Sequence, residues 1–232
     1  MLNLKELRVA RGEGDERHEV YLPELALISG QVAAIVGPSG CGKSTLLEAI
    51  GLLLAPSTLQ SYSLGKAKTD VAALLHNRNE NTLASIRSKD IGFLLQNGGL
   101  LPYLSVRDNI TLPRRLLGLP ASSERIQHAC AKLRLDALLD KRPSALSIGE
   151  RQRTAFVRAM AHEPQVLLAD EPTAALDPYA GAQLFDLMVS LVKELDMAAL
   201  VVSHDYTLVD QFKLPRLAAS LTPEGCCFAF AQ

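Results

Sequence analysis

The chain has 232 residues, of which 48% are hydrophobic, and its 24 basic and 25 acidic residues leave a formal net charge of −1. These values are close to those of average globular proteins, so they exclude a disordered chain, a collagen-like repeat and a disulfide scaffold. The length allows one large domain, or one core with an insertion, and excludes a long multidomain protein.

The balanced charge gives no sign of a nucleic-acid-binding surface, which normally has a basic excess, and no nucleic-acid partner is expected. No apolar run approaches the ~20 residues that span a bilayer, and residues 1–11 lack the apolar stretch of a signal peptide. Cys41, Cys130, Cys226 and Cys227 show no CxxC spacing, so a reducing compartment fits best. We expect a cytoplasmic protein that reaches a membrane only through a partner.

Two segments near the N-terminus, 4–9 and 20–28, have strand character and flank a charged turn at 12–17, which predicts an antiparallel edge. A short apolar run follows at 32–36, and a helical pattern covers 43–54. Residues 100–160 have helix-period apolar residues, four prolines and no convincing strand. This stretch is therefore predicted to be a helical insertion.

Two more apolar runs, 166–169 and 198–202, flank a second helical pattern at 183–195. Because hydrophobicity in the three runs is continuous rather than alternating, both faces of each strand should be covered, as in a parallel sheet between helices. The predicted fold is therefore α/β. Residues 221–232 are predicted to form a short hairpin.

A glycine-rich motif, G-x-x-x-x-G-K-[ST], occupies residues 37–44, directly after the first apolar run and before a helix. Such a loop turns its backbone N–H groups inward, and the positive end of the helix dipole adds to the attraction for a polyphosphate. Lys43 should reach the β and γ phosphates, and the Ser44 hydroxyl should bind Mg²⁺. The predicted nucleotide-binding residues here are Gly37, Pro38, Ser39, Gly40, Cys41, Gly42, Lys43, Ser44 and Thr45.

A pair of carboxylates, Asp170 and Glu171, ends the second apolar run. Side chains alternate along a strand, so consecutive acids suit two tasks. We expect Asp170 to organise the metal and Glu171 to polarise the attacking water.

With these motifs the chain resembles the nucleotide-binding subunits of ABC transporters over nearly its whole length. Gln96 is similar to the Q-loop glutamine, residues 146–153 to the family signature, 175–177 to the D-loop, and His204 to the switch histidine. Segments 101–110 and 150–153 are most similar to the ATPases of lipoprotein-releasing and macrolide-exporter-type complexes.

The resemblance implies a single ABC ATPase domain with a P-loop NTPase core at 1–96 and 162–232 and a helical signature subdomain at 97–161. Two copies would enclose two ATP molecules, with Ser147 and Gly149 of one chain at the γ-phosphate held by Lys43 of the other. Glu171, His204 and Lys43 would be catalytic, and Ser44, Gln96 and Asp170 would hold Mg²⁺. Gln96, Ser147, Gly149 and Asp177 would add to the ATP site, and an integral membrane permease would be the partner on the inner face of the cell membrane.

Independently of the resemblance, Ser147 and Glu150 have the spacing of a capping box, which predicts a helix from Ser147 to about residue 161. Ile148 departs from the family pattern, which has glycine there, and a β-branched side chain limits close approach to a phosphate. The aromatic residue that stacks on adenine is also missing. Arg11 aligns with it, with His18 and Tyr21 as the nearby flat groups, and base recognition stays open.

Three other functions compete with a transport ATPase. A DNA-repair or ribosomal ABC ATPase would need a long coiled coil or two cassettes, which 232 residues do not accommodate. A P-loop kinase would leave the signature and His204 unexplained. An ATP-binding subunit with little turnover, which holds a division-linked or secretion-linked membrane complex together, stays as the alternative.

Overall fold

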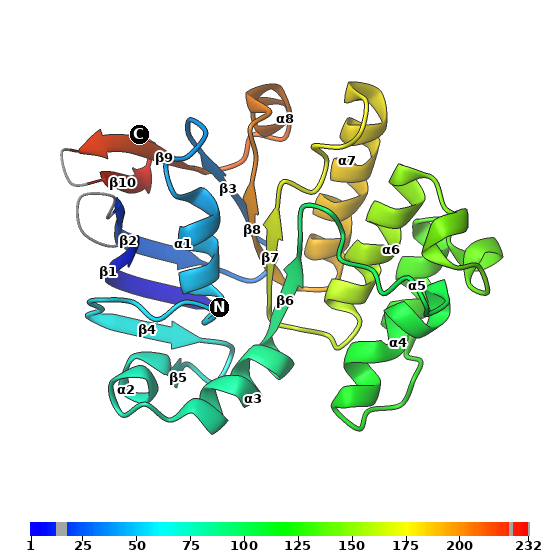
Figure 1. Cartoon of the computed structure of the whole chain (residues 1–232), viewed down its shortest axis with the longest axis horizontal. Helices are drawn as coiled ribbons and strands as arrows, with labels where there is room; N and C mark the ends of the chain where they lie inside the picture. Colours follow the sequence, from blue (N-terminus) through cyan, green and yellow to red (C-terminus); the bar gives the residue numbers. More distant parts are fainter. Residues whose placement is uncertain (13–17, 223–224, 232) are drawn as a thin grey trace.

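The computed structural model describes residues 1–12, 18–222 and 225–231, and in this part ten strands form one sheet (Figure 1). The strand order is β5-β4-β1-β2-β10-β9-β3-β8-β7-β6. The strands are β1 (Leu2–Arg11), β2 (His18–Leu27), β3 (Val32–Val36), β4 (Ser61–Leu64), β5 (Thr69–Asp70), β6 (Ile91–Leu94), β7 (Val166–Asp170), β8 (Ala198–Val202), β9 (Arg216–Thr222) and β10 (Gly225–Phe230).

One half of the sheet is parallel, in the order β9, β3, β8, β7 and β6. Every residue of β3 and β8 is buried, as continuous apolar runs require when helices or strands cover both faces. The three buried strands predicted from the sequence are confirmed, and β7 extends one residue further to Asp170.

The other half is largely antiparallel and carries the N-terminus. β1 pairs with β2 from Leu2–Leu27 to Arg11–His18, and β4 and β5 extend this edge. The predicted antiparallel edge is confirmed, while residues 13–17 of its predicted turn lie outside the described residues. The C-terminal hairpin of β9 and β10 is also confirmed, although it begins at Arg216, and it joins the halves because β10 pairs with β2 and β9 with β3.

The first predicted helix, 43–54, is shorter in the structure, since α1 (Lys43–Ile50) ends where Gly51 caps it. The helix predicted at 183–195 is longer, because Asp177 caps α7 (Pro178–Glu194) and Pro178 suits its first turn. Segment 71–90, for which the sequence analysis predicted no element, forms α2 (Val71–His76) and α3 (Glu80–Asp90). A short helix, α8 (Tyr206–Gln211), follows β8.

Residues 97–161, all of them described, contain helices and no strand, as predicted. The helices are α4 (Val106–Leu116), α5 (Glu124–Lys132), α6 (Ile148–Met160) and two 3₁₀ turns, Asp136–Leu138 and Pro143–Ala145. They gather on the side of the molecule away from β1 and β2, with α7 next to them (Figure 1). In the described part of the chain, every helix is too short or too polar to cross a bilayer.

The parallel strands separate two hydrophobic clusters. Along β3, Val32, Ala34 and Val36 pack in the cluster formed with α4 to α7, and Ala33 and Ile35 pack in the cluster formed with α1, β1 and β2. This alternation fixes the strands between two covered faces, and it leaves their carboxyl ends together at one edge of the sheet.

Candidate functional site

Four sequence motifs follow the carboxyl ends of four adjacent parallel strands. The glycine-rich loop 37–44 follows β3, His204 follows β8, Glu171 follows β7 and Gln96 follows β6. Because β3, β8, β7 and β6 are neighbours in that order, motifs more than 160 residues apart in sequence meet at one sheet edge.

The glycine-rich loop needs glycine where it turns into α1. Gly42 has φ of 95°, in the left-handed region, and a Cβ atom there would lie 2.3 Å from Cγ2 of Val20. A Cβ atom at Gly37 would lie 2.5 Å from Cβ of Ala219. Any larger residue at these positions would push the loop away from the strands that hold it.

Lys43 is folded back along this loop, where it is only 5% exposed. Its Nζ atom donates to the carbonyl oxygens of Gly37 at 3.0 Å and Pro38 at 2.7 Å. The adjoining pocket, of about 240 Å³, is lined by Ser39, Gly40, Gly42, Lys43, Ser44, Thr45, Glu171 and His204. An ammonium group, a helix N-terminus and three hydroxyl-bearing residues thus line one cavity, an arrangement suited to phosphate.

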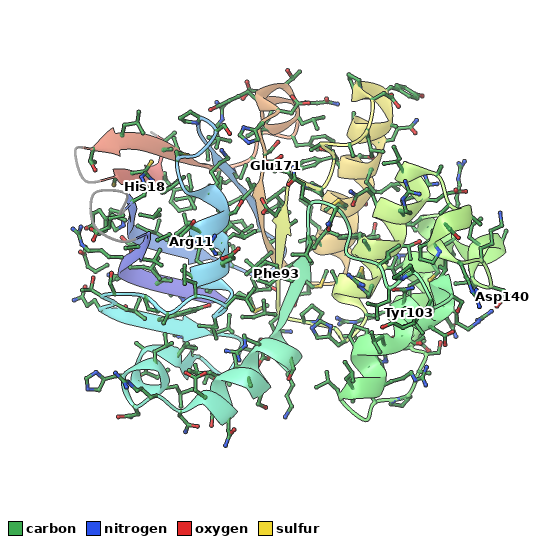
Figure 2. All side chains as sticks on the ribbon, in the orientation of Figure 1. Arg11, His18, Phe93, Tyr103, Asp140 and Glu171 are labelled. Atoms are coloured by element: carbon green, nitrogen blue, oxygen red, sulfur yellow. The ribbon has the colours of Figure 1, made fainter. Side chains whose placement is uncertain are left out.

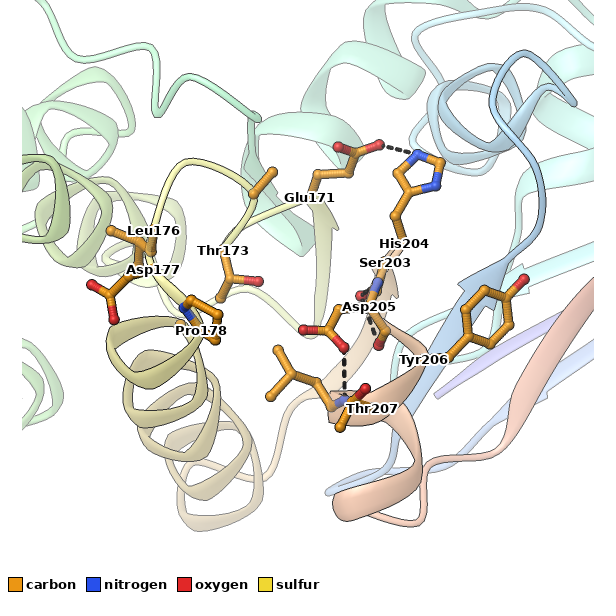
Figure 3. Close-up of a pocket in the computed structure, with 13 residues that line it drawn as sticks. Glu171, Thr173, Leu176, Asp177, Pro178, Ser203, His204, Asp205, Tyr206 and Thr207 are labelled. Atoms are coloured by element: carbon orange, nitrogen blue, oxygen red, sulfur yellow. Dashed lines mark hydrogen bonds and ion pairs between the residues drawn. The ribbon is translucent and has the colours of Figure 1, made fainter.

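Both carboxylate oxygens of Glu171 have partners from other motifs. Oε1 lies 2.7 Å from Nε2 of His204 (Figure 3), and Nε2 of Gln96 donates to Oε2 at 3.0 Å. The backbone of Glu171 has φ of 45°, and its N–H donates to the carbonyl of Val202 at 3.1 Å. Glu171 is therefore held in one place by Val202 of β8, by His204 after β8 and by Gln96 after β6.

Asp170 ends β7, and its Oδ1 atom is buried with no hydrogen-bond partner among the described residues. A buried carboxylate oxygen without a partner is costly, and a bound cation would satisfy it. The Asp170 carboxylate and the Ser44 hydroxyl are oxygen ligands of the kind that Mg²⁺ prefers, so these residues fit the ion. Gln96 is directed to Glu171 instead, and its predicted role at the metal stays a prediction.

Comparisons with known proteins agree with this geometry. A family profile described as ABC transporter matches residues 23–174. The lipoprotein-releasing system ATP-binding protein LolD of Nitrobacter hamburgensis is 40% identical over 81% of this chain and 79% of its own length. LolD of Idiomarina loihiensis is 36% identical over 92% of both chains.

The chain belongs to the ABC transporter ATPase family. Members of this family bind and hydrolyse ATP, and the resemblance derived from the sequence is confirmed.

Solved structures agree with this assignment. The ATP-binding cassette MJ0796, in a dimeric post-hydrolysis state bound to ADP and Pi, superposes with a TM-score of 0.77 at 30% identity over 94% of both chains. CbiO1 of Clostridium perfringens, part of the transporter complex cbiONQ, has a TM-score of 0.77 at 27% identity, over 94% of this chain and 83% of its own. The predicted P-loop NTPase fold is confirmed by these neighbours.

The segment predicted to be the family signature lies at the start of α6. Ser147 caps the helix by accepting from the N–H of Glu150, and the Glu150 carboxylate accepts from the N–H of Ser147 at 2.7 Å. This backbone hydrogen bond lowers the pKa of Glu150. The predicted capping box is confirmed. Ile148, at the first turn, is 45% exposed.

The structure does not bring every predicted site residue to the pocket beside Lys43. The predicted residues outside its lining are Gly37, Pro38, Cys41, Gln96, Ser147, Gly149, Asp170 and Asp177. The carboxylate of Asp177 caps α7 by accepting from the N–H groups of Tyr179 and Ala180. Asp177 instead lines a neighbouring pocket of about 590 Å³ that shares Glu171 and His204 with the first (Figure 3).

The groups considered for base recognition lie on the antiparallel half of the molecule, where Figure 2 shows Arg11 and His18. Arg11 forms an ion pair with Glu48. The guanidinium of Arg8 lies over the ring of Tyr21, with Cζ of Arg8 4.0 Å from the centre of that ring. Of these groups His18 approaches the glycine-rich loop, with Nε2 3.3 Å from the carbonyl oxygen of Cys41.

Sequence reasoning missed two residues that contact the site from α6. Nε2 of Gln152 donates to the carbonyl of Gln96 at 2.8 Å, and Arg158 donates to the carbonyls of Gly98 and Gly99. A spacing of six residues turns about 120° around a helix, so the sequence carried no signal that both residues contact the segment after β6.

Proposed function

We propose that this ABC ATPase drives a lipoprotein-releasing type of transporter. The proposal rests on relatives named as lipoprotein-releasing ATP-binding proteins that match up to 92% of the chain. In it, two copies bind permease subunits at the inner face of the cell membrane, and ATP binding and hydrolysis close and reopen the pair. The substrate contacts the permease and not this chain.

In this proposal the loop 37–45 binds the phosphates of ATP, and Lys43 exchanges the carbonyls of Gly37 and Pro38 for the β and γ phosphates. Ser44, Asp170 and Gln96 hold Mg²⁺, which neutralises charge on the phosphates when it is bound. Glu171 polarises the attacking water, and His204 holds the γ-phosphate and the carboxylate in register. The unpartnered Oδ1 of Asp170 supports the metal assignment.

The contact between Gln96 and Glu171 sets a condition on this reaction. A carboxylate has about four acceptor sites, and His204 and the Gln96 amide occupy one on each oxygen, so the contact with Gln96 restricts how Oε2 can face a water molecule. We therefore propose that Gln96 leaves Oε2 before Glu171 polarises the water, and that hydrolysis waits for this movement.

The signature completes the site from a second copy. Ser147 is exposed at the N-terminus of α6, and Gly149 lies in the same helical turn. The helix dipole and free N–H groups there suit the γ-phosphate held by a partner chain, with Asp177 beside the shared boundary. Residues 97–161 then act as the helical signature subdomain and residues 1–96 and 162–232 as the core. The dimeric form of the neighbour MJ0796 supports this arrangement.

The single observation that carries the proposed ATP hydrolysis is the convergence of Lys43, Glu171 and His204 on one pocket. The test is Glu171→Gln, which keeps the shape of the side chain but removes its charge. We expect this variant to bind ATP, to accumulate as a dimer and to release Pi at least about 10²-fold more slowly. Glu24→Gln, at an exposed side chain of β2 that pairs with Lys5, is the control and should turn over normally.

Unimpaired Pi release by Glu171→Gln would contradict the proposal. Tight nucleotide retention without turnover in the wild-type complex would favour the alternative, a subunit that uses ATP to hold a membrane assembly together.

The lipoprotein assignment has its own test, which is purification of the tagged chain from membranes. We expect a four-span permease with a large periplasmic domain to co-purify, and a six-span permease would contradict the assignment.

A further inference from the structure

One face of α6 holds the loop that carries Gln96. Gln152, Ala155 and Arg158 recur every three residues and so form one ridge, which turns around the helix by about 60° at each step. Nε2 of Gln152 donates to the carbonyl of Gln96 at 2.8 Å. Arg158 donates from its two terminal nitrogens to the carbonyls of Gly99 at 2.7 Å and Gly98 at 2.8 Å. Residues 96–99, here named the Gln96 loop, are thus bound to α6 through three backbone carbonyls.

The contact is close and mostly removed from water. Gln152 is 4% exposed, and burial lowers the pKa of Arg158. Gly98 has φ of 72° and Gly99 has φ of 58°, and a Cβ atom at Gly98 would lie 3.2 Å from Cβ of Ala155. The two glycines let the loop backbone lie directly on the helix, so a movement of α6 also moves the loop.

The same contact leaves one group unsatisfied. Oε1 of Gln152 is buried and has no hydrogen-bond partner among the described residues, and it is 3.8 Å from where a Cβ atom of Gly98 would stand. A buried acceptor without a partner disfavours this arrangement by about 1–3 kcal/mol relative to one that satisfies it. A position of the Gln96 loop that offered a donor to Oε1 would be favoured over this one by that amount.

The α6 helix connects Ser147 at its N-terminus with the Gln96 loop, which packs on the helix. Its N-terminus carries Ser147, and thirteen helical residues form a rod of about 20 Å. Gln152 and Arg158 then connect this rod to Gln96, whose side chain donates to Glu171 at 3.0 Å. Described contacts thus run without a gap from the signature to the carboxylate of the same chain.

We propose that Gln152 and Arg158 are positioning residues that couple the two ATP sites of the dimer. When the signature of one chain engages the nucleotide of its partner, α6 moves, and its hydrogen bonds to the Gln96 loop withdraw Gln96 from Glu171 in the chain's own site. This inference rests on the proposed function, because it requires that Ser147 acts on the partner's nucleotide.

The test compares Gln152→Leu and Arg158→Met with wild type in the full chain. Both variants keep side-chain bulk but remove the donors to the Gln96 loop. Wild type should hydrolyse ATP with a Hill coefficient above one, and each variant should lower kcat about tenfold and bring the Hill coefficient to about one. ATP affinity, measured in the Glu171→Gln background, should change less than about threefold. Arg158→Lys keeps one donor and should recover part of both losses.

Arg114→Met is the matched control. Arg114 is another buried arginine that donates to backbone carbonyls, those of Pro120 and Ala161, but it makes no contact with the Gln96 loop. It should lower the melting temperature and leave the Hill coefficient of the folded protein unchanged.

A direct readout is available because the chain contains no tryptophan. Tyr103 is 68% exposed and follows the Gln96 loop, so Tyr103→Trp gives a single fluorophore near it. ATP should change its fluorescence in the Arg114→Met background and not in the Arg158→Met background.

The outcomes separate this inference from the proposed function. If wild type hydrolyses ATP and Glu171→Gln does not, the proposed function stands. The inference is then overturned by Gln152→Leu and Arg158→Met variants that keep wild-type kcat and cooperativity, by a wild-type Hill coefficient of one, or by equal losses in Arg114→Met. Absence of hydrolysis in the wild-type complex would instead remove the proposed function.

Discussion

Glu171 combines a strained backbone with a carboxylate held from two sides. Its φ of 45° is in the left-handed region, which costs a residue with a Cβ atom roughly 1–2 kcal/mol relative to glycine. The hydrogen bond from its N–H to Val202 and the contacts to His204 and Gln96 hold it there. Such strain persists where the surrounding structure requires it, which fits a residue placed for chemistry.

This strain can be measured by comparing Glu171→Gly with Glu171→Ala. Both variants lose the carboxylate and should lose Pi release, but glycine alone relieves the backbone. We expect Glu171→Gly to have a free energy of unfolding about 1 kcal/mol higher than Glu171→Ala, measured by urea denaturation. Equal stability of the two variants would show that the left-handed conformation stores no strain.

At the level of single residues, the sequence indicates the chemical role of a side chain better than it indicates which residues that side chain contacts. The consecutive acids were assigned different tasks, and the structure separates them, with Asp170 buried and unpartnered and Glu171 between His204 and Gln96. The contacts of Gln152 were not predictable, because they require knowledge of where the loop after β6 returns over α6. Ile148 is exposed at the first turn of α6, and its effect on turnover stays a prediction.

At the level of elements, prediction succeeded where the sequence pattern reflects burial. β3 and β8 were delimited by their uniform apolar runs, since such runs need cover on both faces. Segment 61–90 gave no prediction because its elements are short and largely exposed: β5 has two residues, and α2 buries a single residue, Val71. Such elements are fixed by neighbours that periodicity does not reveal.

Helices α5 and α7 are joined by a charged cluster around Glu194. Lys132 and His128 of α5 and Ser190 of α7 all contact its carboxylate. Lys132 first, and then His128 and Ser190, lower the pKa of Glu194 to about 2. A carboxyl whose pKa is depressed in the folded state stabilises the fold fully above its unfolded value of about 4.3, and this contribution disappears as the pH falls from there to about 2.

Glu194→Gln should therefore remove the contribution to stability that wild type loses as the pH falls. At pH 7 we expect a loss below about 1 kcal/mol, because the carboxylate is 41% exposed and solvent screens the pairs. Between pH 4.5 and pH 2, the stability of the variant should fall less steeply than that of wild type, as measured by thermal unfolding at each pH. Parallel curves of stability against pH for Glu194→Gln and wild type would contradict the lowered pKa. The control is Glu24→Gln, on the opposite half of the fold, whose curve should have the same slope as that of wild type.

At the level of the whole molecule, the sheet order explains why distant motifs form one site. The sequence does not predict this order, because periodicity places residues on strands but does not say which strands are neighbours. The order β3, β8, β7, β6 brings the glycine-rich loop, His204, Glu171 and Gln96 side by side, whereas α6 carries Ser147 away from that edge. One chain thus holds a phosphate site and a signature that do not meet each other.

That separation predicts complementation between two inactive variants. Lys43→Ala should inactivate the phosphate loop, and Ser147→Arg should block the signature, so each homodimer has two defective sites. In an equal mixture, about half of the dimers contain one chain of each kind, and in these the loop of the Ser147→Arg chain faces the intact signature of the Lys43→Ala chain.

One of the two sites in each mixed dimer is then complete, and Pi release should recover to about one quarter of the wild-type rate if the sites act independently. Cooperative coupling through α6 would reduce this recovery, and adding Arg158→Met to both chains should restore part of it. Differently tagged chains, captured in sequence, verify that mixed dimers form. Wild-type activity in Ser147→Arg alone would mean that each chain completes its own site, and the head-to-tail arrangement would be wrong.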